Sequence, residues 1–166
     1  MSDPPVVSGP LFSICTPVHD PPVALLSACL DSIAAQTVDD WELCLVDDNS
    51  SDPAVLAELR RRAATDSRVR LVERSEAGGI VAASNAALAL ATGEFVVLVD
   101  HDDRLEPDAL EQVAGAIAAD PTIDYLYTDE DKLAPGGATY DTFHKPDWSP
   151  ERLRSQNYCT HLSVLR

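Results

Sequence analysis

The chain has 166 residues, of which 45% are hydrophobic and 24% charged. This balance is typical of one globular domain with its own hydrophobic core. The formal net charge of -16 at pH 7 repels phosphate backbones and anionic lipid headgroups, which argues against nucleic acid as a partner. No stretch has the pattern of a secretory signal or the length of a transmembrane segment, so we expect a cytoplasmic protein.

The four cysteines occur singly, at Cys15, Cys29, Cys44 and Cys159. Without a C-x-x-C pair, neither a zinc site nor a redox motif is indicated. Their apolar surroundings favour buried, reduced thiols in a reducing compartment.

Apolar runs and amphipathic segments alternate along most of the chain. The Pro-rich residues 1–10 predict a flexible arm. Strands are predicted at 11–16, 41–46, 69–73, 95–99 and 123–128, the first of them ending at Pro17, and helices at about 22–36, 54–65, 81–91 and 109–119. This alternation predicts an α/β fold with a mostly parallel sheet covered by helices on both faces.

The pattern weakens after residue 132. Residues 135–137 predict a turn, which could form the tip of a hairpin, and residues 151–155 predict one or two helical turns. Residues 162–165 are apolar and begin another strand.

Acidic side chains follow the most apolar strand. Residues 95–99 form an unbroken apolar run that predicts a strand buried on both faces, and Asp100, His101, Asp102 and Asp103 come directly after it. In an open α/β sheet, ligands bind beyond the carboxyl ends of the strands. Because close carboxylates repel one another, a bound divalent cation would stabilise them. The alternative is a solvated acidic turn in which one aspartate caps the next helix.

Two other predicted strands also end in acids, Asp47 and Asp48 after the second and residues 129–131 after the fifth. We therefore expect one edge of the sheet to be acidic. A phosphoryl-accepting receiver domain also carries such acids, and residues 145–146 would supply its Lys-Pro pair. That class needs its acid pair after the first strand and a single accepting Asp in the middle, whereas here the pair follows the second strand.

Three other classes lack their motifs. No G-x-G-x-x-G lies between the first strand and helix, and Gly78-Gly79 is not followed by Gly-Lys-Ser/Thr. No G-x-S-x-G elbow occurs. Dinucleotide cofactors, P-loop phosphates and a serine nucleophile are therefore unsupported.

Five segments in order, residues 16–20, 32–37, 41–52, 85–94 and 99–103, resemble the family 2 glycosyltransferases. The resemblance runs from about residue 11 to the end of the chain. It implies the GT-A fold and a nucleoside-diphosphate sugar bound through a D-x-D metal motif. Residues 127–132 and 143–150 resemble bacterial members that build surface polysaccharide, rhamnosyltransferases among them.

The resemblance implies a pocket for the donor's base. Asp48 corresponds to the acid that accepts the N3–H of uracil or thymine, and a carboxylate is suited to this because it is acceptor-only. Its alternative role is to cap the next helix, which residues 49–51 could serve equally. Thr16, Pro17 and Val18 correspond to the loop that lines the base.

The resemblance also implies the metal ligands. Asp100 and Asp102 match the two acids of D-x-D, with Asp102 the direct ligand of Mn²⁺ or Mg²⁺, and His101 and Asp103 have secondary roles at the donor. The ion would bridge both phosphates and stabilise the leaving nucleoside diphosphate. His161 corresponds to residues near the phosphates in relatives, or is a core histidine.

The implied function is inverting transfer of a sugar from a UDP- or dTDP-sugar to a glycan or lipid-linked acceptor. The general base normally follows the segment where this chain stops, after Arg166, and of the late acids at 129–131 and 147 none matches its motif. Residues 11–132 would then be the nucleotide-sugar-binding domain and 133–166 the start of an acceptor-side segment, with the fold incomplete at its C-terminus.

A rival hypothesis is a truncated or non-catalytic nucleotide-sugar-binding fragment or subunit. Residues 162–165 would lack sheet partners, and such an exposed edge favours homo-oligomers. Missing parts could bring the protein to the inner face of the membrane.

Overall fold

The computed structural model describes residues 9–166, so most of the arm predicted for residues 1–10 lies outside it. Its strands are β1 Phe12–Val18, β2 Trp41–Asp47, β3 Val69–Glu73, β4 Phe95–Leu98, β5 Tyr125–Tyr127, β6 Glu130–Leu133, β7 Thr139–Phe143 and β8 Ser163–Leu165. Its helices are α1 Val23–Ala34, α2 Pro53–Thr65, α3 Gly79–Leu90, α4 Ala109–Ala119 and α5 Pro150–Leu153.

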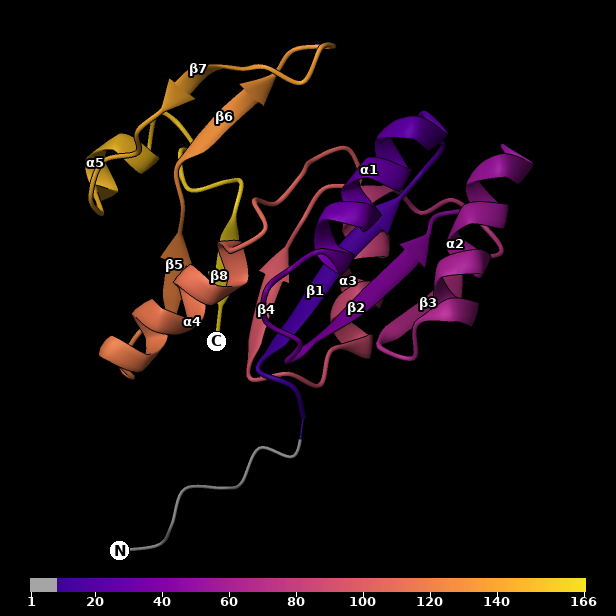
Figure 1. Cartoon of the computed structure of the whole chain (residues 1–166), viewed down its shortest axis with the longest axis horizontal. Coiled ribbons are helices and arrows are strands. Elements are labelled where there is room, and N and C mark those ends of the chain that lie inside the picture. The colour runs from indigo at the N-terminus through magenta and orange to yellow at the C-terminus, as the bar shows by residue number, and fades with distance from the viewer. Residues whose placement is uncertain (1–8) are drawn as a thin grey trace, which may run out of the picture.

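One six-stranded sheet, in the order β3-β2-β1-β4-β8-β5, forms the centre of the molecule (Figure 1). The strands β3, β2, β1 and β4 are parallel to one another, and β8 runs antiparallel to both β4 and β5. It follows that β5 runs in the same direction as β4, and the carboxyl ends of β1, β2, β4 and β5 face one edge, called here the carboxyl edge. The hairpin of β6 and β7 is a separate sheet, as the turn at 135–137 suggested.

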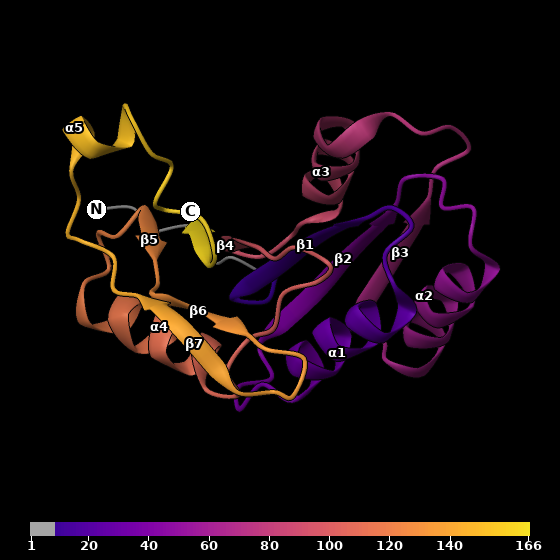
Figure 2. The same cartoon turned by 90° about the horizontal axis from the view of Figure 1, so that it is seen from above.

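Helices cover both faces of the sheet, with α1, α2 and α4 on one side and α3 on the other (Figure 2). The first side holds the main core, because α1 presents Leu26, Leu30 and Ile33 at helical spacing and all three are buried. On the second side, the buried Ala83 and Ala87 of α3 pack against the strands. Their small side chains let the helix lie close to the sheet. Among residues 9–166, no helix is both long enough and apolar enough to cross a bilayer.

Pro17 does not end the first strand, contrary to the prediction. The carbonyl of Cys15 accepts the amide of Val99 at 3.2 Å, and the carbonyl of Val18 accepts the amide of Asp48 at 2.8 Å. Alternate residues of β1 therefore face β4 and β2. Pro17 faces the side on which β4 has already ended, so its missing N–H leaves no sheet hydrogen bond unmade.

The strand β4 is buried on one face only, which corrects the expectation for residues 95–99. Phe95 and Val97 point into the main core and are buried, whereas Leu98 is 41% exposed. The cause is the position of α3, which packs over β1 and β2: on that face of β4, Val96 is partly buried against the α3 cluster and Leu98 is exposed.

The prediction that residues 162–165 lack sheet partners is wrong. Val164 of β8 pairs with Val97 on one side and with Leu126 on the other. Its side chain is 1% exposed. This segment fills the gap between two strands that are close in space, so it offers no free edge and gives no support for a homo-oligomer.

Candidate functional site

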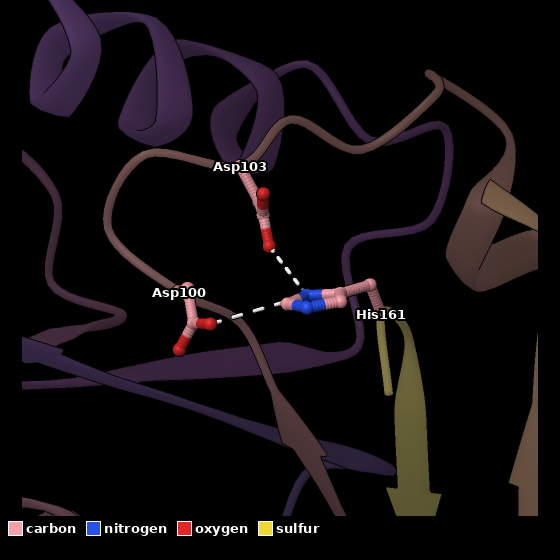
Figure 3. A group of neighbouring side chains, drawn as sticks. All are labelled: Asp100, Asp103 and His161. Atoms are coloured by element: carbon pink, nitrogen blue, oxygen red, sulfur yellow. Dashed lines mark ion pairs between the residues drawn. The ribbon is translucent and has the colours of Figure 1, made fainter. Parts of the chain in front are cut away.

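Two acids and a histidine converge at the carboxyl end of β4 (Figure 3). Asp100 and Asp103 lie in the turn that follows this strand, where the amide of Asp103 donates to the carbonyl of Asp100 at 3.1 Å. The Nδ1 atom of His161 is 2.8 Å from Oδ2 of Asp103 and 3.9 Å from Oδ2 of Asp100. His161 is there because β8 runs antiparallel beside β4, so that the residues before β8 lie next to those after β4.

These three side chains, called here the metal group, offer ligand atoms that all lie within 4.8 Å of one another. Burial raises the pKa of Asp103 above its usual range; the charges of Asp100 and Asp102 add to the rise, and His161 opposes it. Because the ionised form is disfavoured there, a cation would stabilise it. Two carboxylates and an imidazole fit Mn²⁺, since carboxylates suit Mg²⁺ and Mn²⁺ and imidazole favours transition metals.

The structure brings Asp100 into the metal group but not its expected companion. Asp102 is exposed and is absent from the groups of metal-ligand atoms found among the described residues. Nδ1 of His101 lies 3.2 Å from the carbonyl of Pro17, which links the acidic turn to the end of β1. The ligand role assigned to Asp102 stays a prediction, and the arrangement makes Asp103 and His161 stronger candidates than the sequence did.

Asp48 forms a second polar centre at the end of β2, with its side chain only 4% exposed. Its carboxylate accepts the amide of Gly78 at 3.0 Å and that of Gly79 at 2.7 Å, and Nε of Arg74 lies 2.7 Å from Oδ1. The hydrogen bond from Gly78, with those from Gly79 and the charge of Arg74, holds the pKa of Asp48 below its usual range. The carboxylate is therefore fixed as an anion at the start of α3.

Asp48 caps α3 and not the helix that follows it in sequence, so the alternative prediction for this residue named the wrong helix. The cap of α2 is Asp52, whose side chain accepts the amide of Ala54 at 2.8 Å. None of residues 49–51, which the sequence offered for this role, is the N-cap.

The segment predicted to line the base is buried. Thr16, Pro17 and Val18 all lie inside β1. Within the described part of the chain, the hydroxyl of Thr16 has no hydrogen-bond partner. The exposed residues come next: Nδ1 of His19 lies 3.0 Å from the carbonyl of Asp48, and Asp20 accepts the amide of Ser51 at 2.7 Å. The loops after β1 and β2 are thus tied together at the carboxyl edge.

The acids after β5 are engaged elsewhere. Asp129 accepts the amide of Lys145 at 2.8 Å and lies 2.8 Å from Nδ1 of His144. Its neighbours lead into the hairpin, which rises beyond the ends of β5 and β8 in Figure 1. These acids share the carboxyl edge but are not part of the metal group.

Sequence reasoning missed Arg74, the partner of Asp48, and Lys145, whose buried amine contacts the carbonyl of His161. Arg74 carried a weak signal, since it follows the third strand as Asp48 follows the second. Lys145 was noticed only as part of a Lys-Pro pair, because nothing local predicts its contact with residue 161.

The sequence model described as Glycosyl transferase family 2 matches residues 13–158 of this chain. The O-antigen biosynthesis protein RfbC of Myxococcus xanthus is 44% identical over 157 residues, which cover 95% of this chain and 12% of RfbC. The chain therefore spans about one eighth of the length of that relative.

Two solved proteins share the architecture. S. aureus TarS 1-349 in complex with UDP-GlcNAc has a TM-score of 0.74 at 24% identity, over 93% of this chain and 45% of TarS 1-349. Its complex with UDP aligns at 26% identity with a TM-score of 0.66, over 78% of this chain and 38% of that one. The mannosyltransferase PcManGT of Pyrobaculum calidifontis, in complex with GDP-Man and Mn²⁺, is 31% identical with a TM-score of 0.63. The alignment covers 72% of this chain and 35% of PcManGT. The expected GT-A fold is confirmed.

Proposed function

The chain belongs to glycosyl transferase family 2, and we propose that it binds a UDP- or dTDP-sugar together with Mn²⁺ or Mg²⁺ for transfer of the sugar with inversion. The acceptor would be a glycan or a lipid-linked glycan of a bacterial surface polysaccharide. The name of the relative RfbC supports this acceptor class. The UDP bound to TarS and the Mn²⁺ bound to PcManGT support the donor and the ion.

The observation that carries the proposal is the convergence of Asp100, Asp103 and His161 at the carboxyl end of β4. Ligands of open α/β sheets bind at this edge. A protein with a net charge of -16 would repel a diphosphate unless a cation screens the carboxylates. The metal group answers that need, because it offers two oxygens and a nitrogen close enough to share one ion.

Different residues at the carboxyl edge would bind the ion and the base of the donor. The metal group and Asp102 would hold the ion, which when bound neutralises charge on the diphosphate as it leaves. Asp48 would accept the N3–H of the base, with the guanidinium of Arg74 beside it as a donor for a ring oxygen. His101, Thr16, Pro17 and Val18 would shape the strand end beneath the donor.

The base would have to compete for Asp48, because Gly78 and Gly79 already donate to both of its oxygens. A small movement of the turn before α3 would free one acceptor position. The pocket proposed here is therefore formed by Asp48, Arg74 and this turn, with residues 16–18 behind it.

Equilibrium binding of UDP, dTDP, GDP and ADP in the presence of Mn²⁺ tests the proposal. We expect the two pyrimidine nucleotides to bind at least about tenfold more tightly than the purines, because only they offer a ring N–H next to two carbonyl oxygens while all four share the diphosphate. Equal affinity for all four would contradict the base pocket. Absence of binding by all four would contradict the function.

A further inference from the structure

We propose that Lys145 is a positioning residue that holds His161 in the metal group, an inference that rests on the metal-dependent function proposed above. Lys145 lies just after β7, in the segment that leads back to the main sheet. Its side chain is only 1% exposed, although lysine is one of the residues least often buried. The amine has a defined set of partners.

The ammonium group of Lys145 makes two hydrogen bonds and one ion pair. It donates to the carbonyl of His161 at 2.7 Å and to the carbonyl of Thr160, and it lies 3.0 Å from Oε2 of Glu130. A buried charge is stable only when it is paired and its hydrogen bonds are made. Two of these partners are backbone carbonyls, that of His161 and that of Thr160 directly before it.

The side chain of His161 needs such support because little else holds it. It is 43% exposed and has a backbone φ of +57°, in the left-handed region that residues with a Cβ rarely adopt. Its own contacts in the metal group are carboxylates on another segment. The direction of the imidazole is therefore set by the local backbone, which Lys145 contacts through two carbonyls and Thr128 through the amide of Leu162 at 3.1 Å.

A lysine on the hairpin provides the matched comparison. Lys132 has a side chain that is 62% exposed and pairs with Asp141 across the hairpin. It carries the same charge as Lys145 and belongs to the same part of the chain, but it does not contact the segment that carries His161 in the described structure. Removal of this amine should leave the metal group unchanged.

The test uses Mn²⁺ alone, titrated by electron paramagnetic resonance into the full chain and its variants. We expect Lys145→Met and His161→Ala each to weaken Mn²⁺ binding about tenfold or more, in the range found when residues that orient a metal ligand are removed. Lys132→Met should bind as the unchanged protein does. In the double variant K145M/H161A, the affinity should equal that of H161A, because Lys145 acts only through His161.

The double variant separates positioning from a general structural role. Losses that add in K145M/H161A would overturn the proposal, as would unchanged affinity in K145M. If K145M does not fold, Glu130→Gln replaces it with almost no change in volume. E130Q should cause a smaller loss than K145M, and this loss should disappear in the H161A background; no loss would overturn the proposal.

A second measurement follows the imidazole directly. Of the four histidines, His161 should show the strongest broadening of its ring proton signals by traces of Mn²⁺, and this effect should weaken in K145M. If the signals of His161 were not broadened although Asp100→Asn still weakened Mn²⁺ binding, the role of Lys145 inferred here would be wrong. If D100N had no effect, the proposed function itself would be wrong.

Discussion

Replacement of Asp48 by asparagine tests how the chain would recognise the base of its donor. In the structure, Oδ1 accepts from Gly78 and is paired with Arg74, and Oδ2 accepts from Gly79. Asparagine has nearly the same shape but only one acceptor oxygen. Its NH₂ group would have to face either a glycine amide or the guanidinium, donor against donor.

The expected size of the effect follows from the lost acceptor. A hydrogen bond to a charged group that is lost on truncation weakens binding by about 10- to 150-fold. We therefore expect UDP to bind D48N that much more weakly in the presence of Mn²⁺. Pyrophosphate, which has no base, should bind almost unchanged because its contacts are with the ion.

Isothermal titration calorimetry with UDP and with pyrophosphate measures both effects. Asp52→Asn is the matched control, since this residue caps α2 on the same edge through a single oxygen, and asparagine caps helices as well as aspartate does. D52N should bind both ligands normally. An equal loss for UDP and pyrophosphate in D48N would contradict a base-binding role and leave Asp48 with the capping of α3 alone.

Three further predictions concern the metal and the stability of the fold. Asp102→Asn should weaken UDP binding about tenfold in Mn²⁺ and leave it unchanged in EDTA, as calorimetry would show; the same loss in both would contradict a metal role. Arg61 and Arg62 lower the pKa of Glu58 from 4.5 to about 2, so its stabilisation, about 1–3 kcal/mol, is present above pH 4.5 and lost as the pH falls toward 2. Urea unfolding of Glu58→Gln should therefore differ from the unchanged protein at pH 7 and converge with it near pH 2; a constant difference would contradict this. Glu42→Ala removes the acceptor of the buried Ser13 hydroxyl and of the Thr92 amide and hydroxyl and should cost about 1–3 kcal/mol in urea unfolding, whereas a loss below about 1 kcal/mol would mean that the network contributes little.

The local elements could be predicted from the sequence because their signals are local. The strand at 69–73 and the helix at 109–119 have the bounds that the apolar spacing indicated. The acids after β2 and β4 do lie at one edge of a parallel sheet, since parallel strands carry their carboxyl ends to the same side.

The long-range contacts could not be predicted in the same way. The pairing of β8 with β4 joins residues that are 65 to 69 positions apart, from Leu98 with Ser163 to Val96 with Leu165. No local pattern specifies such a pairing, yet it is what brings His161 to Asp103. The capping of α3 by Asp48 is similar, because several acids at the carboxyl edge could have served it.

Binding of UDP to the chain, measured with Mn²⁺ and again with EDTA, shows whether the donor site depends on a metal ion. We expect tight binding in Mn²⁺, a loss of about tenfold or more when EDTA removes the ion, and the same loss in D100N with Mn²⁺ present. The same UDP affinity in EDTA as in Mn²⁺ would contradict a metal-dependent donor site formed by Asp100, Asp103 and His161.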